Sequence, residues 1–85
     1  MTKEKHLEAE ILRLLADRGS GKTICPSEAA RAAAGSDERE AWEPLMKPAR
    51  EAAERLVAEG KIVVTQGGRV VDGRTVKGPI RLRLC

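Results

Sequence analysis

The stretch of this 85-residue sequence that most suggests a chemical site is the glycine-rich run at residues 16–23, Ala-Asp-Arg-Gly-Ser-Gly-Lys-Thr. It satisfies a relaxed phosphate-binding-loop pattern in which Ala16 replaces the usual first glycine. That motif requires a strand before the loop and a helix after it, so that backbone N–H groups and the helix dipole meet the phosphates. Here a helical pattern comes first, and Pro26 follows Thr23 too soon for a helix to begin at Lys22. We therefore interpret residues 16–23 as a turn that ends a helix, and we expect no cofactor.

The other residue types that could do chemistry are too sparse to form a site. His6 is the single histidine, and Cys25 and Cys85 lie far apart in the sequence, so no metal-ligand spacing is present. Ser27 has no second histidine to activate it as a nucleophile, and it can instead cap a helix. We expect a non-enzymatic protein with no catalytic residue, no metal and two free thiols.

Basic residues offer a clearer functional signal, because they are concentrated near the C-terminus. The whole chain carries a net charge of +3, but residues 1–60 have ten basic and twelve acidic side chains, a net −2. Residues 61–85 have six basic side chains against one acid, a net +5. Such local asymmetry indicates a polyanionic partner better than the overall charge does. The basic residues are Lys61, Arg69, Arg74, Lys77, Arg81 and Arg83.

Helical periodicity predicts three helices that must position these charges, at about residues 3–18, 26–34 and 43–59. Pro26 fits the first turn of the second helix, with Cys25 or Ser27 as its cap. The polar connection before Trp42 leaves room for another helical turn, and prolines near the start of the third helix should tighten, kink or restart it. Two sets of apolar residues should face the core: Leu7, Ile11, Leu14 and Leu15 in the first helix, and Leu45, Ala49, Ala52, Ala53, Leu56 and Val57 in the third.

The periodicity changes to that of strands after the third helix. Residues 61–66 are β-branched, residues 79–84 alternate between apolar and basic, and the loop 67–78 between them contains the turn signal Gly67-Gly68. A brief extended segment can also form just before Pro26. This order predicts an α+β fold, a winged helix-turn-helix in which a three-helix bundle is closed by a small two-stranded antiparallel β-wing. We expect residues 1–85 to be a single domain.

The exposed face of the third helix carries mixed charge, which bears on whether it enters a DNA groove. Glu51 and Glu54 lie among Lys47, Arg50 and Arg55, and the spacing allows i,i+4 ion pairs. Because a groove-facing surface should be basic, solvated helix surface is the favoured interpretation. Trp42, the sole aromatic residue, is expected to anchor the entry to this helix over the core, with an exposed interface anchor as the alternative.

Several segments together resemble a family of small bacterial proteins grouped as domain of unknown function 3253. The resemblance runs from about Ile11 to Leu84, with Glu43 a departure where a basic residue is expected. It implies a winged-helix-like fold and leaves the function open. The segments that carry it are Lys22-Thr23-Ile24-Cys25-Pro26-Ser27-Glu28-Ala29-Ala30-Arg31, Trp42 with Leu45-Met46, Arg50 and Ala53, Gly60-Lys61-Ile62 with Thr65-Gln66-Gly67-Gly68, and Gly78-Pro79-Ile80-Arg81-Leu82.

The order of helices and strands, together with the basic C-terminal quarter, leads to the hypothesis of a module that binds duplex DNA, as a dimer or beside a partner protein. The wing cations would contact backbone phosphates, and Lys47, Arg50 and Gln66 would lie nearest the bases. The alternative is a protein–protein interaction module, which the partly acidic third helix favours. No signal peptide or membrane span is expected, so the location should be cytoplasmic. The candidate nucleic-acid-binding residues are Lys47, Arg50, Gln66, Arg69, Arg74, Lys77, Arg81 and Arg83.

Overall fold

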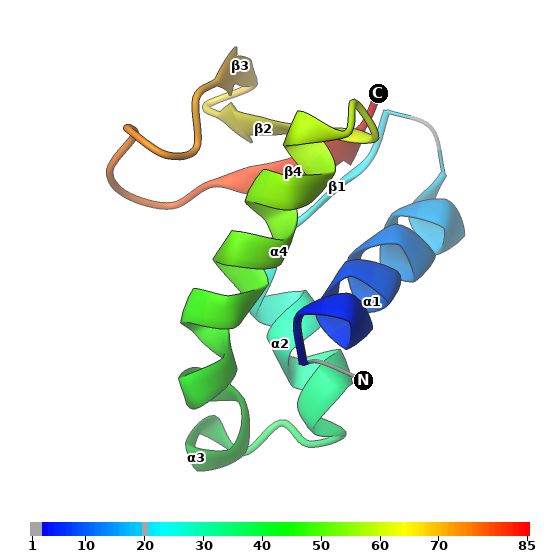
Figure 1. Ribbon diagram of the computed structural model, residues 1–85, viewed down its shortest axis with the longest axis vertical. Helices are drawn as coiled ribbons and strands as arrows, with labels where there is room; N and C mark the ends of the chain where they lie inside the picture. The colour runs from blue at the N-terminus through cyan, green and yellow to red at the C-terminus, as the bar shows by residue number, and fades with distance from the viewer. Residues whose placement is uncertain (1–2, 20) are drawn as a thin grey trace.

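The computed structural model describes residues 3–19 and 21–85 and has the expected α+β class, with helices packed on one face of a small antiparallel sheet (Figure 1). Helices α1 (Lys3–Arg18), α2 (Pro26–Ala34) and α4 (Met46–Ala58) form the bundle, and the arrangement is winged-helix-like. None of the helices in these two ranges is long and apolar enough to cross a bilayer.

Helices α1 and α2 span the ranges that the periodicity predicts. In α1 the buried stripe is Leu7, Ile11 and Leu15, and the Gly19 N–H donates to the Leu15 carbonyl at 3.0 Å where the helix ends. Ser20, part of the expected turn, lies outside the described residues. The turn follows a helix and leads into strand β1 (Thr23–Ile24), which is the reverse of the order that a phosphate-binding loop needs.

Cys25 is the N-cap of α2, and its backbone N–H donates to Oε2 of Glu28 at 2.8 Å. Pro26 occupies the first turn, where its missing N–H costs nothing because that donor has no partner within the helix. Both cysteines are free thiols.

The third helix was predicted over residues 43–59, and its predicted start is wrong. The chain instead forms α3 (Arg39–Trp42), a 3₁₀ turn η1 (Glu43–Leu45) and then α4, which ends at Ala58. The prolines explain the break: Pro44 sits in η1 and Pro48 falls in the first turn of α4, where neither removes an interior helical hydrogen bond.

Two contacts hold the half-buried Trp42 at this break. Its Nε1–H donates to the Asp37 carbonyl at 3.1 Å, and the guanidinium of Arg31 lies 5.5 Å from the ring centroid. The indole therefore ties α3 to α2, as a structural anchor does.

The predicted two-stranded wing is in fact part of a four-stranded sheet with the order β1-β4-β2-β3. Strand β2 (Ile62–Gln66) pairs with β3 (Arg69–Val71) on one side and with β4 (Arg81–Leu84) on the other, and β1 adds to β4. The expected loop 67–78 thus contains a strand. Gly67 and Gly68 have φ of 60° and 82°, which suits a two-residue hairpin turn and allows β3 to form.

The last strand starts at Arg81 rather than at 79. Pro79 cannot donate a ladder hydrogen bond, and residues 72–80 form a loop between β3 and β4.

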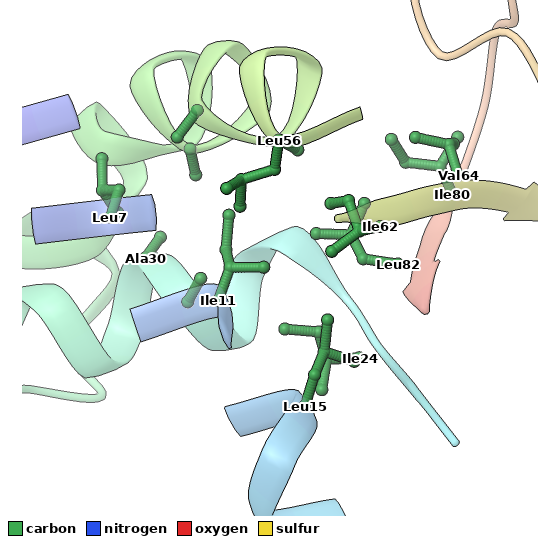
Figure 2. Packing of buried hydrophobic residues seen from close by; sticks show 14 residues of the cluster. Leu7, Ile11, Leu15, Ile24, Ala30, Leu56, Ile62, Val64, Ile80 and Leu82 are labelled. Carbon is green, nitrogen blue, oxygen red and sulfur yellow. The ribbon is translucent and has the colours of Figure 1, made fainter. Parts of the chain in front are cut away.

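The core lies between the helices and the inner face of the sheet (Figure 2). Leu56 of α4, Ile62 of β2 and Leu82 of β4 converge there with the α1 stripe, each 1% exposed or less. Val57, expected on the core face of the third helix, is instead 40% exposed, because α4 turns only a narrow stripe of mostly small side chains inward. That stripe is Ala49, Ala52, Ala53 and Leu56.

Candidate nucleic-acid interface

The 72–80 loop lies beside α4 and is closed at its start by a tight turn. The Asp72 carbonyl accepts hydrogen bonds from the N–H groups of Thr75 and Val76, both at 3.1 Å. A Cβ on Gly73 would come within 3.1 Å of Val64, so this part of the loop packs directly on β2. The start of the loop therefore packs on the sheet and has defined carbonyl and N–H partners.

Gln66 and Arg50 fix the far end of this loop. The side-chain amide of Gln66 donates to the carbonyls of Lys77 (2.7 Å) and Pro79 (3.2 Å), and Nη2 of Arg50 donates to the Gly78 carbonyl at 3.4 Å. The donor group of Gln66 thus holds the loop, and the expectation that Gln66 lies nearest the bases stays a prediction. Gln66 is thus a positioning residue.

The bond from Arg50 to the Gly78 carbonyl places the backbone of Lys77 and Gly78 beside α4. Lys47 is exposed and precedes Arg50 by three residues on α4, a spacing that places two side chains on the same helix face. Lys77 is exposed on the loop that Arg50 contacts. We call this set, Lys47, Arg50 and Lys77, the α4–loop surface.

Arg74, another expected cation of the wing, is compensated by its neighbour. It bonds both carboxylate oxygens of Asp72, at 3.2 and 3.3 Å. The side-chain hydrogen bond from Arg74, helped by the Arg74 backbone N–H, lowers the pKa of Asp72 below its ordinary value. Arg74 therefore already has a carboxylate partner on the protein.

Arg81 and Arg83 project from the outer face of the sheet, because β4 turns Leu82 inward between them. Nε of Arg81 donates to the Thr23 hydroxyl at 3.0 Å, and its Nη2 to the Thr23 carbonyl at 3.3 Å. Arg83 lies opposite Thr23 and Val63 in the ladder. The sequence placed these arginines correctly on the outward face but did not show that this face is separate from α4.

Ion pairing separates the cations of the described residues, Lys5 aside, into two groups. One group has carboxylate partners: Arg13 with Glu10, Arg18 with Glu28, Arg31 with Asp37, Arg39 with Glu43, Arg55 with Glu8, Lys61 with Glu59 and Arg74 with Asp72. The other group has no carboxylate at ion-pair distance within residues 5–19 and 21–85: Lys22, Lys47, Arg50, Arg69, Lys77, Arg81 and Arg83. Most candidates fall in the second group. Lys22 belongs to it too but was not predicted, because its glycine-rich surroundings resemble a phosphate loop rather than a basic patch.

The i,i+4 ion pairs expected along the third helix do not form for Lys47 with Glu51 or for Arg50 with Glu54 in the described structure. Arg55 bonds Glu8 across the α1–α4 contact at 2.8 Å. The exposed carboxylates of Glu51 and Glu54 therefore remain on the surface of α4.

A groove of about 430 Å³ runs between the C-terminal half of α4 and the start of the 72–80 loop. Its walls are mainly apolar, with Glu54 and the Asp72–Arg74 pair at the rim. The apolar lining comes from Val57, Ala58, Val64 and Val71. In the described residues, no three histidine, cysteine, aspartate or glutamate side chains gather in a way that could hold a metal ion.

Fold and surface together define a small α+β domain of winged-helix-like arrangement with an uncompensated cationic surface beside its third main helix. A family model described as a protein of unknown function (DUF3253) matches residues 4–85, so the chain belongs to this family, as the resemblance in the sequence indicated. The search of curated proteins found no match to this sequence.

Proposed function

We propose that this domain is a non-enzymatic, cytoplasmic module that binds duplex DNA through the α4–loop surface. The observation that supports it is selective pairing: Lys47, Arg50 and Lys77 have no carboxylate at ion-pair distance, whereas most other described cations have one. Unpaired cations are the groups that can replace counterions on phosphates.

Two features of the geometry favour phosphate contacts here. Lys47 lies in the first turn of α4, where the helix dipole adds positive potential. The hydrogen bond from Arg50 goes to a neutral carbonyl, that of Gly78, so the guanidinium keeps its full charge while its position is fixed. A fixed cation loses less conformational entropy when it binds.

The acidic middle of α4 limits how the DNA can lie. Glu51 and Glu54 follow Lys47 and Arg50 on the same helix, and they would repel phosphates if α4 entered a groove along its length. We therefore propose that the contacts are chiefly to the sugar–phosphate backbone, with little selectivity for base sequence.

Titration of a fluorescent duplex at low salt, followed by anisotropy, tests the proposal. Binding should appear by tens of micromolar protein and weaken steeply between about 50 mM and about 200 mM salt. Lys47→Gln/Lys77→Gln should weaken binding and lower the slope of log K against log salt by about one for each cation removed. Arg13→Gln/Arg39→Gln is the matched control, with the same change in net charge at ion-paired positions.

Each outcome decides something definite. No binding of duplex DNA by the unaltered protein at low salt would refute the function. Equal losses in the two double variants would show that only net charge matters, which would refute the α4–loop surface.

The apolar groove supports a second candidate function, a protein–protein interaction module. Val57 is exposed on its wall, and Glu54 on its rim would repel nucleic acid. A partner protein whose binding is lost on Val57→Asp but retained in Lys47→Gln/Lys77→Gln would favour this candidate over DNA.

A further inference from the structure

Strand β3 is an open edge of the sheet in the described structure, since it pairs with β2 and has no strand on its other side. An open edge presents backbone donors and acceptors to any strand that approaches it. Proteins often protect such edges with proline or charge; Arg69–Val71 contains no proline, and its single charge, Arg69, has no carboxylate partner in the described structure.

In the β2–β3 hairpin, hydrogen-bonded and non-hydrogen-bonded residue pairs alternate, and this leaves the backbone groups of one residue of β3 directed outward. The two-residue turn at Gly67-Gly68 makes Gln66 and Arg69 the hydrogen-bonded closing pair, so Thr65 and Val70 form the next, non-hydrogen-bonded pair. The N–H and C=O groups of Val70 are therefore directed away from β2, toward the open edge.

Val70 is also the most exposed large apolar side chain of the described residues, at 60%. Its outward backbone groups and its exposed side chain coincide at the centre of the three-residue strand. The same residue thus offers hydrogen bonds and apolar area to one occupant, another extended strand.

We propose that two copies of this chain associate by antiparallel pairing of their β3 strands about a two-fold axis at Val70. In this register the two Val70 residues exchange a pair of N–H···O=C hydrogen bonds, and Arg69 of each copy lies opposite Val71 of the other. Such a two-fold interface is self-complementary, because the same strand of each copy provides the donors and acceptors that the other copy needs.

Charge complementarity supports a second copy as the occupant. Val71 lines the apolar groove whose rim, formed by Glu54 and the Asp72–Arg74 pair, carries a net negative charge, so the register brings the unpaired Arg69 of one copy beside the groove of the other. Arg69 and Val71 share one face of β3, the face that pairs with Gln66 and Val64. The cation therefore approaches a carboxylate, and its aliphatic stem covers the groove.

Because β3 has only three residues, the association should depend strongly on concentration. Sedimentation velocity in the absence of DNA should show the 9.2 kDa monomer giving way to a species of twice that mass as the protein concentration rises to hundreds of micromolar. This measurement does not depend on whether the domain binds DNA.

Two substitutions at one position separate strand pairing from simple apolar contact. Val70→Pro removes the outward N–H and should abolish the dimer, whereas Val70→Thr keeps that N–H and a β-branched shape and should retain it. Circular dichroism checks that both variants stay folded. Arg69→Glu should weaken the dimer at least several-fold, and adding Glu54→Arg should restore it.

The results that overturn the proposal are equally specific. A strictly monomeric protein at millimolar concentration refutes the association. A dimer that survives Val70→Pro places the interface elsewhere, and equal loss in the proline and threonine variants shows that side-chain contact rather than strand pairing holds the copies together. Failure of Glu54→Arg to restore the Arg69→Glu variant refutes the register.

Discussion

The side-chain amide of Gln66 donates to the Lys77 carbonyl at 2.7 Å and so joins the end of β2 to the loop that presents the Lys77 charge. A second bond from the same amide reaches Pro79. The glutamine is followed directly by the Gly67-Gly68 turn, so the hairpin and the longer loop are held at one point.

Replacing Gln66 with methionine should loosen the loop, because methionine has no hydrogen-bond donor. The side chain keeps a similar length, so packing should change little. The free energy of unfolding should fall by about 1 kcal/mol, and DNA affinity at low salt should fall by less than about tenfold. NMR order parameters of the Lys77 and Gly78 backbone amides should fall, because the Gln66 amide no longer holds this part of the loop. The amides of Thr75 and Val76, which bond Asp72, are the internal control, and unchanged order at Lys77 would contradict the positioning role.

Removing the acids of α4 should strengthen DNA binding if phosphates pass close to this helix. Glu51→Gln/Glu54→Gln removes two exposed carboxylates beside Lys47 and Arg50, and the anisotropy titration should show a lower Kd at low salt. Glu38→Gln/Glu40→Gln makes the same change in net charge on and next to α3 and should have a smaller effect. An equal gain in both variants would mean that α4 is not near the DNA.

The order of the helices and the outward alternation of β4 could be predicted because each depends on local periodicity. Leu7, Ile11 and Leu15 repeat at helical spacing, and Leu82 lies between two arginines. The residues of β3 were assigned to the loop 67–78 because three residues are too short for a periodic signal, and the strand exists only through its pairing with β2.

The sequence predicted which residues could form the candidate site, but not which of them lie together in the fold. Local charge counts found the cations, yet only the tertiary contacts show that Arg50 meets Gly78 while Arg81 meets Thr23 on the sheet. The same limit applies to Arg74, whose pairing with Asp72 depends on the turn geometry at the start of the loop.

Trp42 should contribute to stability rather than to a partner surface. Trp42→Phe removes the bond to the Asp37 carbonyl and should lower the free energy of unfolding by about 1 kcal/mol, and Trp42→Ala by about 2 kcal/mol because contact with Arg31 is lost as well. Since no other aromatic residue reports on folding, urea unfolding should be followed by circular dichroism. Stability equal to that of the unaltered protein would favour the exposed-anchor interpretation.

Glu28 should make the stability of the domain sensitive to acid. Partial burial tends to raise its pKa, but hydrogen bonds from the Cys25 N–H and from Arg18, with the positive charge of Arg81, outweigh it and lower the pKa below its ordinary value of 4.5. A carboxyl whose pKa is lower in the folded state stabilises that state above the unfolded pKa, and this contribution is lost as the pH falls through the folded value.

Glu28→Gln should therefore reduce the urea midpoint at pH 7, and the difference from the unaltered protein should shrink as the pH falls below about 4.5. Glutamine keeps the size of the side chain but not the charge that Arg18 and Arg81 favour. Glu40→Gln, at an exposed carboxylate of α3, is the control and should leave the midpoint nearly unchanged at both pH values. A difference for Glu28→Gln that stays constant from pH 7 into the acid range would show that the carboxylate charge does not contribute to the stability of the fold.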